Sequence, residues 1–231
     1  MQKDILSKIK NGLIVSCQAL EHEAMYSENG GVMPLFALAA KRAGGVGIRA
    51  NTVRDIKEIK DKVDLPIIGI IKQDYDDSNV FITPTMKEID SLMEIGVDII
   101  AMDATLRKRP GGRNLNTFFK EIKDKYPNQL FMADCATYEE CINAAEIGFD
   151  FIGTTLSGYT EESKDSPRPN FELIERLSKE ISTPIIAEGQ IEEPYQARKM
   201  FEKGAFSIVV GGAITRPQQI AERFVKEIKN I

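Results

Sequence analysis

Lys72 and Glu188 each end a short apolar run, and together they form a pair of side chains suited to moving a proton. Lys72 follows the run at residues 66–71, and Glu188 follows the run at residues 184–187. A lysine beside carboxylates suits proton removal from a carbon next to a carbonyl, or imine formation on a keto sugar. Burial or a neighbouring arginine would lower the pKa of Lys72, whereas nearby carboxylates would raise it. A purely structural ion pair of Lys72 is the alternative interpretation.

Most of the other apolar runs also finish in a polar side chain. The residues at these ends are Gln18, Arg49, Asp103, Asp134 and Thr155. If the runs are parallel strands of one sheet, their ends meet at one rim and the polar residues form a pocket there. We therefore expect these five residues to contact a substrate. The alternative is that each is a solvated residue at the start of a loop.

The last apolar run ends in a glycine pair, Gly211 and Gly212, which is followed closely by Arg216. Glycines let backbone N–H groups approach an anion closely, and barrel enzymes often bind phosphate after their seventh and eighth strands. Gly189, directly after Glu188, would complete the cradle, and Arg216 would supply a fixed positive charge. The sequence thus predicts a phosphate site formed by Gly189, Gly211, Gly212 and Arg216.

The elements that must position these residues are eight short apolar runs that alternate with amphipathic helical segments. The runs lie at residues 13–17, 46–49, 66–72, 99–103, 130–134, 151–155, 184–188 and 207–211. Thr52, Thr85 and Thr137 stand where helices would begin. Eight such units predict a single α/β domain, a (β/α)8 barrel over residues 1–231, with a short helical extension at about residues 1–11. An open doubly wound sheet is the alternative, although its nucleotide-binding glycine motif is missing after the first run.

Side-chain alternation along a strand predicts which residues face the inside of such a barrel. If Lys72 points inward, Ile70 shares its face and Ile71 packs against helices. If Glu188 points inward, Ile186 joins it and Ala187 faces outward. By the same rule Cys17 and Cys135 face the helices, because their neighbours Gln18 and Asp134 face inward. Both cysteines are therefore predicted to be buried packing residues.

Composition excludes several classes of function. The 231 residues carry 30 basic and 35 acidic side chains, a net charge of -5, which disfavours binding of nucleic acid. No window approaches the ~20 apolar residues of a membrane-spanning helix. One histidine, His22, and three scattered cysteines predict no disulfide framework, no metal site and no cofactor. We expect a cytoplasmic protein, and its candidate assembly is a homodimer. The basic run at residues 107–109 is either a solvated loop or a feature that overhangs the pocket and attracts an anion.

Seven motifs are spread over essentially the whole chain, namely GLIVSCQAL at 12–20, PIIGIIK at 66–72, DDS at 76–78, ITPT at 82–85, MDAT at 102–105, TTLSGYT at 154–160 and VGGAITRP at 210–217. Together they resemble the bacterial N-acetylmannosamine-6-phosphate 2-epimerases. The resemblance implies a (β/α)8 barrel that interconverts N-acetylmannosamine 6-phosphate and N-acetylglucosamine 6-phosphate during sialic acid breakdown. It also implies that Lys72 and Glu188 are catalytic and that Gln18, Arg49 and Asp134 belong to the site. Gln190 departs from the family pattern, in which Arg or another long donor is expected.

Two other functions fit the same residues. A lyase or aldolase would use Lys72 to form a Schiff base with a phosphorylated keto sugar. A catalytically silent barrel would bind a sugar phosphate and act as a sensor, although sensing requires only the phosphate anchor. Within the epimerase interpretation, Glu188 is either a second acid/base or a group that tunes and aligns Lys72.

Overall fold

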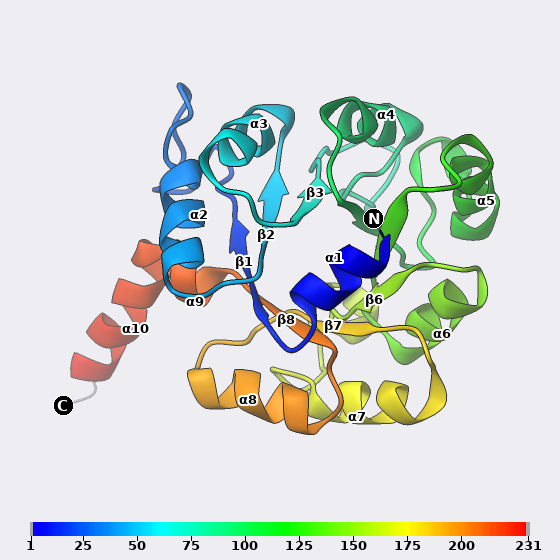
Figure 1. Ribbon diagram of the computed structural model, residues 1–231. Coiled ribbons are helices and arrows are strands. Elements are labelled where there is room, and N and C mark those ends of the chain that lie inside the picture. Colours follow the sequence, from blue (N-terminus) through cyan, green and yellow to red (C-terminus); the bar gives the residue numbers. More distant parts are fainter. Residues whose placement is uncertain (1, 230–231) are drawn as a thin grey trace.

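The computed structural model describes residues 2–229, and its eight parallel strands form a closed barrel. Each strand pairs with the next one along the chain, and β8 pairs with β1 (Figure 1). The strands are β1 (Leu13–Cys17), β2 (Gly47–Asn51), β3 (Ile67–Ile70), β4 (Ile99–Asp103), β5 (Leu130–Asp134), β6 (Phe151–Gly153), β7 (Ile185–Ala187) and β8 (Ser207–Val210). This closure confirms the predicted barrel and excludes the open sheet.

Helices connect the strands around the outside of the barrel, and further helices lie at the two ends of the chain. They are α1 (Gln2–Ile9), α2 (Met33–Arg42), α3 (Val53–Lys62), α4 (Met86–Ile95), α5 (Leu115–Lys125), α6 (Tyr138–Glu146), α7 (Phe171–Glu180), α8 (Pro194–Glu202), α9 (Gly212–Thr215) and α10 (Pro217–Ile228). The predicted starts at Thr52, Thr85 and Thr137 are confirmed, and each threonine side chain accepts a backbone N–H of the first turn. Thr85 and Thr137 also form reciprocal capping boxes with the glutamates three residues later.

Strand alternation divides the core into an inner and an outer layer. Ile70 and Ile186 belong to the cluster inside the barrel. Ala187, Cys17 and Cys135 belong to the cluster between the strands and the helices. The orientation predicted from period-two alternation is therefore confirmed. It directs Lys72 and Glu188, each two positions after an inward-facing isoleucine, toward the barrel axis.

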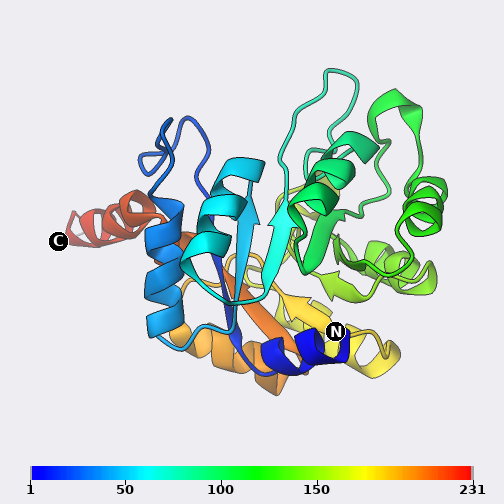
Figure 2. The same cartoon turned by 45° about the horizontal axis from the view of Figure 1, so that its top comes forward.

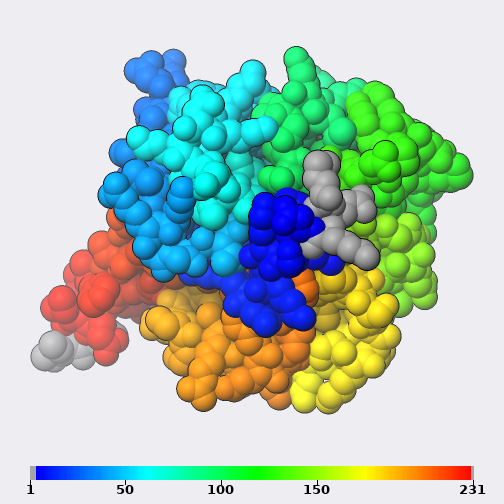
Figure 3. Space-filling view, in the orientation of Figure 1, coloured from blue at the N-terminus to red at the C-terminus, as the bar shows by residue number. Residues whose placement is uncertain are grey.

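The two ends of the barrel differ in character. The side chains of Ile5 and Ile9 on α1 are buried in the inner cluster. In Figure 3 helix α1 covers the middle of the face that looks toward the viewer. The loops that follow β1 and β3 extend beyond the arrowheads at the opposite end (Figure 2). An apolar plug thus closes one end of the barrel and leaves the other end for polar side chains.

Helix α10 is the exception to the close packing of the helices. It projects from the body of the molecule in Figure 1, and none of its described residues is buried. Phe224 and Ile228 are 68% and 66% exposed. Since an amphipathic helix normally packs its apolar face against other protein atoms, this face is open to a partner.

Candidate active site

A cavity of about 690 Å³ opens at the carboxyl ends of the strands. Its lining includes most of the residues predicted from the sequence, namely Gln18, Arg49, Lys72, Thr155, Glu188, Gly189, Gly211, Gly212 and Arg216. Asp134 does not line the cavity but contacts Arg49, which does. Asp103 does not reach it. The structure therefore brings nine of the eleven predicted residues to one cavity at the rim where barrel enzymes place their chemistry.

Arg49 and Asp134 form a buried ion pair behind the cavity wall. Arg49 Nη1 and Nη2 donate to the two carboxylate oxygens of Asp134 at 2.9 and 2.7 Å. Arg49 Nη1 also lies 3.1 Å from Glu188 Oε2. The side chains of Arg49 and Asp134 are 1% and 0% exposed. Such a two-point contact fixes the plane of the guanidinium, so Arg49 presents a rigid cation to the cavity.

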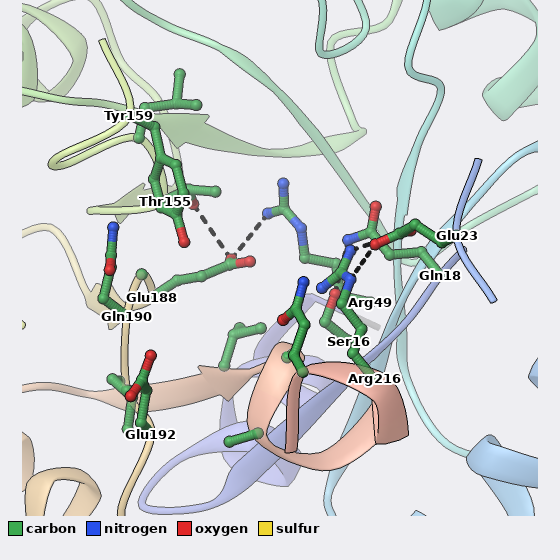
Figure 4. Close-up of a pocket in the computed structure, with 18 of the residues that line it drawn as sticks. Ser16, Gln18, Glu23, Arg49, Thr155, Tyr159, Glu188, Gln190, Glu192 and Arg216 are labelled. Carbon is green, nitrogen blue, oxygen red and sulfur yellow. Dashed lines mark hydrogen bonds and ion pairs between the residues drawn. The ribbon is translucent and has the colours of Figure 1, made fainter. Parts of the chain in front are cut away.

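Glu188 shares its neighbours with Asp134, and Figure 4 shows its carboxylate between Thr155 and Arg49. The Thr155 hydroxyl lies 2.6 Å from Asp134 Oδ1 and 3.2 Å from Glu188 Oε2. One hydroxyl has one proton, so it donates to only one of these carboxylates at a time. Burial, and secondarily the charge of Asp134, raise the pKa of Glu188 to about 7 against the opposing effect of Arg49. Glu188 can therefore hold or release a proton near neutral pH.

Lys72 follows β3 and is half-buried at the cavity mouth. Its backbone N–H donates to Asn51 Oδ1 at 2.9 Å, which holds the chain after the strand. Its side-chain amine makes no hydrogen bond or ion pair with any other residue in the range 2–229. Burial, followed by the charges of Arg49 and Arg216, lowers the pKa of Lys72 to about 8, and Glu23 and Glu188 oppose this. Burial and the two arginines therefore outweigh the two glutamates in setting the pKa of Lys72, and no ion pair to its amine is present among the described residues.

The three glycines line the cavity in two places, Gly189 beside the loop after β6 and the pair of Gly211 and Gly212 beside Arg216. A methyl group on Gly211 would lie 3.6 Å from Arg216 Nη1, and one on Gly212 would lie 3.9 Å from it. Gly189 has a φ of +107°, and a methyl group there would lie 3.2 Å from the Thr154 carbonyl oxygen. Glycine therefore suits all three positions, because larger residues would fill the space beside the guanidinium or strain the backbone.

Gln18 is buried at the cavity wall with one hydrogen bond satisfied. Its Nε2 donates to Ser16 Oγ at 2.7 Å. Its Oε1 has no partner within the described chain. A buried amide oxygen without a partner is costly, so Gln18 is suited to accept a hydrogen bond from a bound ligand.

Asp103 and the basic run differ from the expectations. Asp103 accepts hydrogen bonds from the Thr105 hydroxyl and from Arg107 Nη2, both at 2.7 Å, and so organises its own loop rather than a substrate. Arg109 is 1% exposed and donates to the carbonyl oxygens of Pro84 and Thr83. It is thus neither solvated nor at the cavity, because its guanidinium satisfies buried backbone groups.

Glu23 and Tyr159 line the cavity but were not predicted to do so. Glu23 forms an ion pair with Arg216, visible in Figure 4. Both residues lie in irregular loops, where neither strand alternation nor helical periodicity indicates the direction of a side chain. Gln190, at the position where the resemblance leads us to expect Arg or another long donor, also lines the cavity and has a left-handed φ of +58°.

The described residues offer neither a metal-binding cluster nor a membrane-spanning helix. No three His, Cys, Asp or Glu side chains within residues 2–229 are grouped so that they could hold a metal ion. No helix in the same part of the chain has the length and apolar character needed to cross a membrane.

Known proteins match this chain along most of its length. The family described as putative N-acetylmannosamine-6-phosphate epimerase matches residues 33–230. The chain belongs to this family. A putative N-acetylmannosamine-6-phosphate 2-epimerase of Caldanaerobacter subterraneus is 53% identical, over 99% of this chain and 96% of its own. A protein of the same name from Borreliella afzelii is 54% identical, over 98% of both chains.

A solved structure agrees with the family assignment. The N-acetylmannosamine-6-phosphate 2-epimerase from Clostridium perfringens superimposes with a TM-score of 0.91 at 50% identity, over 96% of both chains. A thiamine phosphate pyrophosphorylase from Pyrococcus furiosus has a TM-score of 0.63 at 16% identity, which indicates a shared fold alone. The sequence resemblance to the epimerase family is thereby confirmed.

Proposed function

We propose that this protein interconverts N-acetylmannosamine 6-phosphate and N-acetylglucosamine 6-phosphate, as an N-acylglucosamine-6-phosphate 2-epimerase of sialic acid breakdown. The observation that carries the proposal is the unpaired Lys72 amine, with its lowered pKa, in a cavity that also holds Glu188 and a glycine-lined anion site. A base of this kind is needed for a C2 proton, which is acidic only while the sugar is an open-chain aldehyde. Family membership supports the same reaction.

In the proposed mechanism Lys72 removes the C2 proton, and negative charge develops on the carbonyl oxygen. Arg49, held rigidly by Asp134, is the cation that stabilises the resulting enolate. Return of a proton to the opposite face of C2 inverts the configuration. Gly189, Gly211, Gly212 and Arg216 hold the phosphate and so keep C2 against Lys72, and Gln18 Oε1 accepts a hydrogen bond from the sugar.

The test follows the C2 proton in heavy water. Product formed by the enzyme in D2O should acquire deuterium at C2, measured by proton NMR. Lys72→Met should abolish both exchange and turnover. Lys226→Met is the matched control, because Lys226 also lines the cavity but projects from α10. Unlabelled product, or undiminished turnover of Lys72→Met, would contradict the assignment.

A Schiff-base lyase is the second enzyme that the same lysine would permit. Borohydride added with substrate should leave no covalent adduct on Lys72 if the protein is an epimerase. A stable adduct found by mass spectrometry would favour the lyase instead.

The phosphate assignment has its own test. The non-phosphorylated N-acetylmannosamine should show a much higher KM than the 6-phosphate, because it cannot use the remote binding energy of the anion site. Equal catalytic efficiency with the two sugars would remove the assignment.

We also propose that the protein acts in the cytoplasm and forms a homodimer in which a second copy covers the apolar face of α10. Phe224, Val225 and Ile228 are 68%, 48% and 66% exposed on that face. Light scattering should give the mass of a dimer, and Phe224→Glu should shift it toward the monomer. A wild-type monomer at micromolar concentration would contradict the proposal.

A further inference from the structure

Glu23 occupies a fixed place beside the anion site that the mechanism above does not use. It lies in the loop after β1, and Arg216 lies after α9, so the two residues stand on neighbouring edges of the barrel mouth. Arg216 Nε donates to Glu23 Oε1, and Arg216 Nη2 lies 3.5 Å from Glu23 Oε2. The side chains of Arg216 and Glu23 are only 20% and 17% exposed. An ion pair in this setting is screened less than one on the surface.

The loop after β1 holds both the carboxylate and the backbone of Glu23 by hydrogen bonds. The Leu20 N–H donates to Glu23 Oε2 at 2.7 Å, and the Glu23 N–H donates to the Leu20 carbonyl oxygen at 2.8 Å. The Glu23 carbonyl oxygen in turn accepts from the Tyr26 N–H at 2.9 Å. Arg216 therefore meets a carboxylate whose position is set by its own loop, and not a freely rotating surface side chain.

The ion pair with Glu23 occupies the Nε and Nη2 edge of the Arg216 guanidinium and does not involve Nη1. Nε and Nη2 face Glu23, whereas Nη1 is the atom beside Gly211 and Gly212. Nη1 makes no hydrogen bond within residues 2–229. Since a guanidinium is rigid and planar, fixing its Nε edge also fixes where Nη1 points. An anion over the glycine pair can therefore bind Nη1 without displacing Glu23.

We propose that Glu23 is a positioning residue for phosphate recognition, which holds Arg216 so that Nη1 faces the anion site at Gly211 and Gly212. The inference rests on the proposed function for the identity of the phosphorylated ligand. The opposite role, in which the Glu23 carboxylate competes with the phosphate for Arg216, would require the ion pair to use the nitrogen that faces the glycines, and it does not.

Glu23 has a second effect that a purely structural residue would not have. The charged groups that act on Lys72 come from four parts of the barrel, namely Arg49 at β2, Glu188 after β7, Arg216 before α10 and Glu23 after β1. The arginines lower the pKa of Lys72, and the two glutamates raise it. Although burial opposes it, hydrogen bonds from Arg216 and from the Leu20 N–H lower the pKa of Glu23, so Glu23 stays charged at neutral pH.

The experiment compares Glu23→Ala and Glu23→Gln with wild type, and uses Glu21→Gln as the matched control. Glu21 is an exposed acid in the same loop and makes no contact with Arg216. The first readout is the Kd for inorganic phosphate, measured by calorimetry, which requires no turnover. Glu23→Ala should weaken phosphate binding about tenfold, the effect of one charge-assisted hydrogen bond. Glu23→Gln retains an acceptor and should lose less, and Glu21→Gln should match wild type.

Kinetics and a double-mutant cycle test whether the effect passes through Arg216. Glu23→Ala should raise KM for the 6-phosphate about tenfold and leave kcat within about twofold. The double-mutant cycle is measured on the phosphate Kd, and in an Arg216→Ala background Glu23→Ala should weaken phosphate binding by less than about a further twofold. Glu23→Gln should move the midpoint of the kcat/KM profile to lower pH, because Lys72 loses a neighbouring negative charge.

Three results would overturn the proposal. They are tighter phosphate binding in Glu23→Ala, which would show competition, full additivity of the two substitutions, and no phosphate binding by the wild type. Failure of the epimerase assignment is distinguishable, since the phosphate Kd and the double-mutant cycle would still respond to Glu23 in a protein without epimerase activity.

Discussion

The Lys72 amine should titrate within the pH range of an ordinary enzyme assay. Burial and the charges of Arg49 and Arg216 lower the pKa of Lys72 from 10.5 to about 8. At pH 7 a pKa of about 8 leaves roughly 9% of the amine neutral, against roughly 0.03% for an unperturbed lysine. The cavity thus supplies about 300 times more of the base form than an exposed lysine would.

The sign and shape of the pH dependence follow from these values. The neutral fraction of Lys72 rises from roughly 9% at pH 7 to roughly 91% at pH 9, so kcat/KM should increase about tenfold and then level off. An unperturbed lysine would give about a hundredfold increase over the same interval with no plateau. If Glu188, with a pKa of about 7, has to be protonated for turnover, the rate passes through a maximum near pH 7.5, midway between the two pKa values, and falls at higher pH. A plateau therefore assigns Lys72 as the sole acid/base, and a bell-shaped profile assigns Glu188 as its partner.

The assay is the initial rate of deuterium incorporation at C2 in buffers of constant ionic strength. It begins at pH 7, because the second ionisation of a phosphate monoester lies near pH 6 and would distort lower values. Lys226→Met serves as the control for general effects of charge at the cavity. A kcat/KM that continues to rise tenfold per pH unit beyond pH 9 would refute the argument, since the base would then not be a lysine desolvated in this cavity.

Three further predictions concern stability and the buried charges. Lys72→Met should raise the free energy of unfolding at pH 7 by about 1–3 kcal/mol in urea titrations, because the folded-state pKa lies below the unfolded one and the charged amine is disfavoured below about pH 8. The gain should shrink as pH rises from 8 to 10. Asp134→Asn should lower the free energy of unfolding by about 3 kcal/mol in the same urea titrations. This is the lower end of the range for breaking a buried ion pair, because Arg49 keeps Glu188 as a partner. Asp103→Asn should lower the melting temperature but leave KM within about twofold, because Asp103 contacts Arg107 and not the cavity.

Strand alternation explains why so much of the site could be predicted. Once eight runs close a barrel, the period of two determines which residues face the axis, and the carboxyl ends bring them to one rim. Ile70 and Ile186 in the inner layer, with Cys17 and Cys135 in the outer one, confirm that register. The boundaries were less accurate. β3 ends at Ile70, two residues before Lys72.

The remaining features depend on contacts that sequence spacing does not encode. Asp103 faces the axis as expected, but Arg107, four residues later, folds back onto its carboxylate. Arg109 belongs to a basic run that looks solvated, yet three-dimensional packing places it over carbonyl groups that would otherwise lack donors. Glu23 meets Arg216 across 193 positions of sequence, from an irregular loop without periodicity. Local sequence patterns thus predicted which way side chains point within strands, but not which side chains of different loops contact each other.

The buried pair of Arg49 and Asp134 also explains why Glu188 can take part in proton transfer. The carboxylates of Asp134 and Glu188 share the guanidinium of Arg49. Asp134 accepts from both Nη nitrogens of Arg49, at 2.9 and 2.7 Å, whereas Glu188 lies 3.1 Å from Nη1 alone. The second carboxylate is therefore left with less compensation than its burial demands, and its pKa rises. Without Asp134, Arg49 would be free to hold Glu188 fully ionised. Asp134 was expected to contact the substrate, but it lies behind Arg49 and does not line the cavity. Its charge instead raises the pKa of Glu188, so that the Glu188 carboxyl can carry a proton near neutral pH.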